Sequence, residues 1–186
     1  QIRSSAASDV YKRQDSVKVI NEKKIDSVKN LLSKVNWKEI CESPKWALFH
    51  GDFHAENIIF SKKKNFVLLD WRQNFGKDNF QYGDTYYDLA KLNHGFIVNH
   101  GVVTKNLFKI KEIKKNHFNF SIHQLSNLME CREFLKDWSK DYDYDFNRIE
   151  LITALIFLNI AGLHDFPYSK FLFHLGQHKL SDSLKI

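Results

Sequence analysis

The sequence predicts an α+β fold that is mostly helical and contains a small β element. Three short apolar runs, at residues 46–49, 58–60 and 66–69, are separated by polar turns, as is typical of short strands. Apolar residues at helical spacing dominate the chain after residue 124. With 186 residues, of which 43% are hydrophobic and 27% charged, the chain suits one domain with a core or one lobe of a larger protein.

The first half is expected to begin with a helix over residues 15–37, because apolar side chains recur there on one face and lysines cover the rest. Residues 46–49 form a strand that leads into a polar loop. Residues 58–60 and 66–69 form two further strands, joined by a lysine-rich turn.

Residues 71–83 are polar and are expected to form a loop, after which Asp84 caps the next helix. Residues 108–122 alternate roughly by two, which predicts a hairpin that turns at about 115–117. The remaining segments are expected to be helices, with Pro167 between the last two: 124–140, 145–162 and 168–184.

The net charge of +6 does not by itself indicate a nucleic-acid partner. The basic residues are dispersed among acids, which favours a solvated lysine-rich surface, and we expect no nucleic acid to bind. The longest apolar run, 151–163, is too short to span a bilayer and is expected to be a buried helix. Two cysteines match no disulfide framework or zinc pattern, so we expect a reducing cytoplasm.

The first fourteen residues differ in character from the rest of the chain. QIRSSAASDVYKRQ has no helical or strand period and resembles translated sequencing-adapter sequence. We interpret residues 1–14 as a non-native segment and residues 15–186 as the native part.

The stretch HGDFHAENIIF, from His50 to Phe60, carries groups suited to metal-assisted phosphoryl transfer. Asp52 can accept the proton of a substrate hydroxyl, and Asn57, five residues later, offers a neutral oxygen to Mg²⁺. Asp70 follows the apolar run 66–69 and offers a charged oxygen at the end of a strand. Acid, amide and second acid in this order predict a phosphoryl-transfer site.

Three motifs in this region resemble those of the aminoglycoside phosphotransferase and choline kinase family. HGDFHAENII at 50–59 is similar to the family's H-G-D-x-x-x-x-N-[IL] signature. LLDW at 68–71 is similar to its [IL]-D-[FW] metal motif, and GDTYYDLA at 83–90 to its G-D-x-x-Y-D-L-A helix start. The resemblance implies the C-terminal lobe of a kinase-like fold, with ATP as phosphoryl donor, Mg²⁺, and a small-molecule hydroxyl as acceptor.

The same resemblance implies a role for each matched residue. Asp52 is expected to be the catalytic base, and Asn57 and Asp70 the metal ligands. His50 is expected, with those two ligands, to contribute to cofactor binding. Asp88 is expected to support the loop by hydrogen bonds.

Two departures from the family pattern matter. Many members carry an acid directly after the D-[FW] pair, whereas this chain has Arg72, which suits contact with a phosphate or an anionic acceptor or else a surface ion pair. No segment before His50 resembles the nucleotide-binding N-terminal lobe. We therefore expect that lobe to be missing and the chain to be inactive as it stands.

Two other classes of function remain open. His50, Asp52, His54 and Asp70 suit a metal-dependent hydrolase, because imidazole and carboxylate groups bind zinc. A non-catalytic binding module is the second alternative. Beyond the motifs, His164 and Asp165 at a helix end are candidates for contact with the acceptor.

Overall fold

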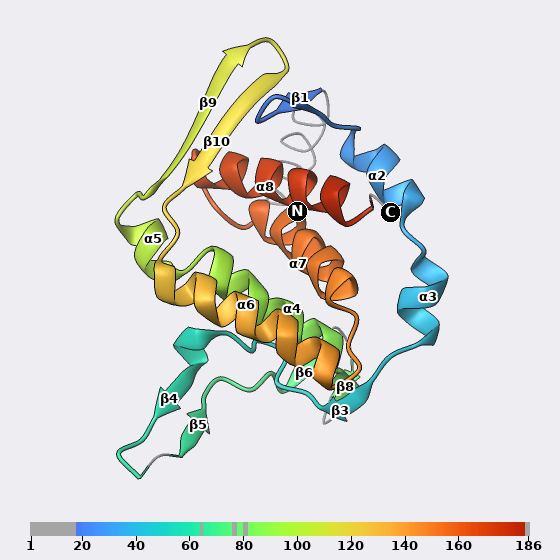
Figure 1. The fold of residues 1–186 in the computed structure, drawn as a ribbon, viewed down its shortest axis with the longest axis vertical. Coiled ribbons are helices and arrows are strands. Elements are labelled where there is room, and N and C mark those ends of the chain that lie inside the picture. Colours follow the sequence, from blue (N-terminus) through green and yellow to red (C-terminus); the bar gives the residue numbers. More distant parts are fainter. Residues whose placement is uncertain (1–17, 64, 76–77, 80–81, 185–186) are drawn as a thin grey trace. The chain divides into compact units, whose positions relative to one another are not determined.

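The computed structural model describes residues 18–63, 65–75, 78–79 and 82–184 (Figure 1). The segment 1–14, interpreted above as non-native, lies outside the described residues. The chain divides into two units: residues 1–35, 100–124 and 153–186 form the first, and residues 36–99 and 125–152 form the second. Runs of helices and runs of short, mostly antiparallel strands follow one another along the chain, so the α+β class predicted from the sequence is confirmed.

The first unit contains a four-stranded sheet with strand order β2-β1-β10-β9. The hairpin β9 (Phe108–Lys114) and β10 (His117–Ile122) was predicted closely, including its turn. Strand β1 (Val19–Ile20) pairs parallel to β10, and β2 (Lys23–Lys24) pairs antiparallel to β1.

The prediction of one helix over residues 15–37 is wrong. Asn21 and Glu22 have φ values of 48° and 66°, and this left-handed pair turns the chain tightly between β1 and β2. Helix α2 (Val28–Lys34) begins only after Ser27, whose side chain accepts a hydrogen bond from the N–H of Asn30. Apolar residues do recur along this segment, but Ile20 is buried as part of strand β1 and not as part of a helix.

Helix α8 (Tyr168–Ser183) packs against β9 and β10 and completes the core of this unit. Phe171 is fully buried and lies 5.0 Å from the ring of Phe108, and His174 stacks on Phe118 at 4.8 Å. The short helix α5 (His100–Thr104), which the sequence did not predict, precedes β9.

The second unit is built around helix α4 (Thr85–Ile97), which contacts helix α6 (Ser126–Asp141) along its length (Figure 1). Helix α3 (Trp37–Glu42) and the first residues of α7 (Phe146–Ala161) belong to the same unit. Leu89 and Ala90 of α4 are buried.

Two small antiparallel sheets flank the loop that carries the motif. Strand β3 (Trp46–Leu48) pairs with β8 (Tyr82–Asp84), and β4 (Ile58–Phe60) pairs with β5 (Phe66–Leu68). The prediction of an unbroken loop over 71–83 is wrong, because β6 (Asn74–Phe75), β7 (Asp78–Asn79) and part of β8 fall within it. The register of β8 on β3 pairs Trp46 with Asp84 and Leu48 with Tyr82, so the start of α4 lies beside the start of β3.

The predicted helices of the second half are confirmed within two residues at each end, as α6, α7 and α8. In the run 151–163, Leu151, Ile152, Ala154, Phe157 and Leu158 are buried, as expected. No helix within the described part of the chain is long and apolar enough to cross a membrane.

Candidate active site

Helix α4 supports the loop between β3 and β4. The carboxylate of Asp88, in the first turn of α4, accepts hydrogen bonds from the backbone N–H groups of His50 and Gly51, at 2.7 and 2.8 Å. Bonds of this kind, with a charged acceptor, are among the stronger ones in proteins. Burial raises the pKa of Asp88, while its bonds to His50 and Gly51 act in the opposite direction.

Glycine is required at position 51 of this loop. Gly51 has a φ of 78°, in the left-handed region, and a Cβ there would lie 2.6 Å from Cγ of Arg72. The N–H of Arg72 donates to the carbonyl oxygen of His50 at 2.9 Å. The segment after Asp70 is therefore packed directly against the loop.

His50 supports the loop from the inside. Its side chain is 2% exposed, and its Nδ1 accepts a hydrogen bond from the N–H of Asp52 at 3.2 Å, which leaves the ring proton on Nε2. Among the described residues, Nε2 has no hydrogen-bond partner. The centroid of its ring lies 4.9 Å from that of Trp71 and 5.7 Å from that of Phe53.

The carboxylate of Asp52 is surrounded by basic groups. Nζ of Lys91 lies 2.7 Å from Oδ1. A guanidinium nitrogen of Arg72 lies 3.7 Å from Oδ2, and Nε2 of His54 lies 3.8 Å from the same oxygen. Sequence analysis missed Lys91, although its position three residues after Asp88 places both side chains on one face of α4.

These neighbours fix the charge of Asp52. His54 and then Lys91 hold the pKa of the Asp52 carboxyl well below its usual range, although partial burial acts in the opposite direction. Asp52 and Glu56 in turn raise the pKa of His54 to about 9. Asp52 is therefore ionised at neutral pH, as an acceptor of protons must be.

Asn57 closes the short helical turn η1 (Ala55–Asn57) and is almost fully buried. Its Nδ2 donates to the backbone carbonyl of Asp52 at 2.9 Å, and this bond fixes the orientation of the side-chain amide. With the nitrogen engaged in this way, Oδ1 is the side-chain atom suited to a metal ion.

A backbone hydrogen bond links the segment that carries Asp70 to Asn57. The N–H of Leu69 donates to the carbonyl of Asn57 at 2.8 Å, just beyond the β4–β5 ladder. Asp70 itself has a φ of 54° and an exposed side chain. The chain leaves the strand in a left-handed conformation here, which costs free energy for any residue with a Cβ and often marks a functional position.

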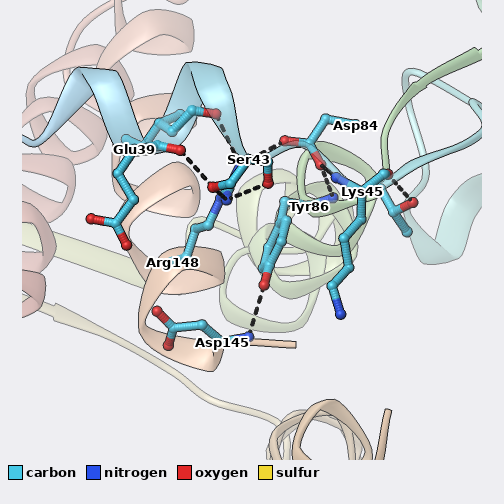
Figure 2. A network of polar contacts seen from close by, with 9 residues as sticks. Glu39, Ser43, Lys45, Asp84, Tyr86, Asp145 and Arg148 are labelled. Carbon is cyan, nitrogen blue, oxygen red and sulfur yellow. Dashed lines mark hydrogen bonds and ion pairs between the residues drawn. The ribbon is translucent and has the colours of Figure 1, made fainter. Parts of the chain in front are cut away.

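A polar network fixes the start of α4, and with it Asp88 (Figure 2). Asp84 caps the helix by accepting from the N–H of Tyr86 at 3.2 Å, and its other oxygen accepts from Arg148 at 3.0 Å. Arg148 also donates to the carbonyls of Ser43 and Ile40, at 2.9 and 3.0 Å, and its guanidinium lies 4.1 Å from the ring of Tyr86. The capping role predicted for Asp84 is confirmed.

The arrangement does not suit the hydrolase hypothesis. Among the residues that the structure describes, no three His, Cys, Asp or Glu side chains come together as a metal set. Nδ1 of His50 is engaged with the backbone of Asp52, and Nε2 of His54 lies 3.3 Å from Nδ2 of Asn57. The imidazoles are thus used within the loop. The amide oxygen of Asn57 and the carboxylate of Asp70 are donors of the type that Mg²⁺ accepts.

A family model described as "Phosphotransferase enzyme family" matches residues 7–100, just over half of the chain. The chain belongs to this family. The match includes Asp52, Asn57, Asp70 and Asp88, and it begins within the segment 1–14 that sequence analysis set aside. Comparisons with curated proteins and with solved structures find no match.

The phosphotransferase family resemblance drawn from the motifs is therefore confirmed. The two other residues that the sequence singled out, His164 and Asp165, belong to the first unit, whereas the loop belongs to the second. Their contact with an acceptor stays a prediction.

Proposed function

We propose that the chain carries the catalytic loop of an ATP- and Mg²⁺-dependent phosphotransferase that acts on a hydroxyl of a small molecule. The observation that supports this most is the arrangement around Asp52. Its carboxylate is ionised, and the buried side chain of Asn57 donates to its backbone carbonyl. A backbone hydrogen bond from Leu69 to Asn57 links this loop to the segment that carries Asp70. In the same proposal, the second unit is the catalytic part of a kinase-like C-terminal lobe.

Asn57 and Asp70 would hold Mg²⁺ through Oδ1 and a carboxylate oxygen. When bound, the ion neutralises charge on the phosphate groups of the nucleotide. We assign no metal or nucleotide contact to His50, because its ring is buried and its Nδ1 accepts from the loop backbone.

Asp52 orients the acceptor hydroxyl. Its Oδ1 is occupied by Lys91, so Oδ2 faces the hydroxyl. In the transfer, the hydroxyl oxygen forms a bond to the terminal phosphorus of ATP. The bond from that phosphorus to the bridging oxygen breaks, the electron pair leaves with ADP, and the hydroxyl proton passes to Asp52.

Transfer from ATP labelled in the terminal phosphate, measured over a panel of acceptor alcohols, tests this proposal. In a version of the protein that also carries a nucleotide-binding N-terminal lobe, Asp52→Asn is expected to lower turnover by about 100-fold or more while nucleotide binding is kept. The matched control is Asp137→Asn on the exposed face of α6, which should leave turnover unchanged. Equal turnover in Asp52→Asn and the control would remove Asp52 from its role.

A further inference from the structure

The basic groups beside Asp52 bear on the class of acceptor, an inference that rests on the proposed function. Lys91 is only 12% exposed and lies 2.7 Å from Oδ1 of Asp52, so it compensates the charge of this carboxylate. Arg72 approaches Oδ2, the oxygen proposed to face the acceptor, at 3.7 Å. A hydroxyl bound to Oδ2 would therefore stand next to the guanidinium.

Arg72 is held in place through its backbone while its side chain is exposed. Its backbone N–H donates to His50, and its Cβ and Cγ occupy the space that a side chain at position 51 would need. The Arg72 side chain is nonetheless 57% exposed, and 3.7 Å is too long for a hydrogen bond to Asp52. The donors of the guanidinium remain suited to a ligand.

The charges also act against one kind of acceptor. An ammonium group close to the reacting hydroxyl would approach three positive side chains, Arg72, Lys91 and the protonated His54, against the two negative ones of Asp52 and Glu56. Like charges placed together oppose binding, whereas a guanidinium matches a carboxylate or phosphate with two parallel hydrogen bonds.

We propose that the acceptor is a hydroxy compound that carries an anionic oxyacid group, a carboxylate or a phosphate, near the reacting hydroxyl. Arg72 binds this group. Lys91 keeps Asp52 oriented, and transfer proceeds as described above, with the hydroxyl proton passing to Asp52.

Three probes with one carbon skeleton test the proposal: glycerate, glycerol and 3-amino-1,2-propanediol. They carry a carboxylate, a hydroxyl and an ammonium group at the same end. Binding is measured without ATP from the backbone amide shifts of Gly51, Asp52 and Arg72 in the ¹⁵N-labelled chain. Glycerate should bind at least about tenfold more tightly than the amine.

Arg72→Gln should reduce glycerate affinity to that of glycerol, and Arg72→Lys should retain part of the difference. Lys38→Gln on α3 removes the same charge from an exposed position and should change nothing. The proposal is overturned if the amine binds as tightly as glycerate, if Arg72→Gln has no effect, or if none of the probes shifts these amides at up to about 50 mM.

Two outcomes distinguish a failure of this inference from a failure of the proposed function. ATP-dependent phosphorylation of a cationic acceptor that is lost in Asp52→Asn would overturn the inference and support the function. Binding of glycerate at Arg72 without any transfer from ATP, in a version that also carries the N-terminal lobe, would support the anion site and count against the function.

Discussion

Nζ of Lys91 lies 2.7 Å from Oδ1 of Asp52, so a helix lysine is paired with the carboxylate proposed as the catalytic base. The same helix supplies Asp88, which holds the N–H groups of His50 and Gly51. Helix α4 therefore sets both the backbone of the loop and the charge of its central residue.

Removal of this lysine should change the ionisation of Asp52. In Lys91→Met, we expect the pKa of Asp52 to rise from its lowered value, because partial burial then acts with less opposition. Carboxyl ¹³C NMR titration measures it directly. Lys91→Arg keeps the charge and should keep the pKa low. An unchanged titration of Asp52 in Lys91→Met would show that the pair has no electrostatic effect.

The hydrogen bonds that Asp88 accepts from the loop should contribute to the free energy of unfolding. Asp88→Asn replaces one accepting oxygen with a donor, so one buried N–H of His50 or Gly51 loses its partner. We expect a loss of about 1–3 kcal/mol in the free energy of unfolding. Denaturant titration measures this loss, and amide exchange at residues 50 and 51 should accelerate. The exposed control Asp137→Asn should stay within about 0.5 kcal/mol of wild type; a similar loss there would contradict the assignment.

The left-handed backbone at Gly51 predicts a contrast between two glycines. Gly51→Ala combines a φ of 78° with a contact of 2.6 Å to Arg72, and should cost about 2–4 kcal/mol. Gly95, inside α4, has only an ordinary 3.4 Å contact to Cβ of His54. Gly95→Ala should lie within about 1 kcal/mol of wild type. Thermal unfolding of both variants is the measurement, and equal stability would contradict the loop geometry.

His54 predicts a specific pH dependence of stability. Its pKa is raised from 6.5 to about 9 by Asp52 and then Glu56, so the folded state holds the proton more tightly than the unfolded state. This contribution is complete below pH 6.5 and is lost as the pH rises through about 9. Urea unfolding between these limits should show a loss that is smaller in His54→Gln. The same slope in both proteins would show that His54 is not the group responsible.

The sequence motifs predicted the phosphotransferase family, which the match over residues 7–100 confirms, whereas apolar spacing predicted some of the surrounding elements wrongly. Spacing between Asp52, Asn57 and Asp70, and the helix cap at Asp84, follow from local patterns. The helix predicted over 15–37 failed because apolar spacing alone does not distinguish a face of a helix from short strands. There, the left-handed turn at Asn21 and Glu22 decides the structure.

Contacts between distant segments are what the sequence could not supply. Asp52 lies in a loop, Arg72 in a segment that follows a strand, and Lys91 in helix α4. No repeat spacing of residues in the sequence connects these three positions. Arg148 reaches Asp84 across 64 residues of sequence, and its hydrogen bonds to the carbonyls of Ser43 and Ile40 depend on the folded backbone. A charged residue with several backbone partners gives no signal in composition.

The metal ligands offer the most direct test of the account. Mn²⁺ added with ADP to the ¹⁵N-labelled chain should broaden the amide signals around Asn57 and Asp70 first. The broadening should weaken in Asp70→Ala and Asn57→Ala and persist in Asp52→Asn. Broadening that centres elsewhere in the chain, or that is unchanged in both ligand variants, would contradict the assignment of this loop to phosphoryl transfer.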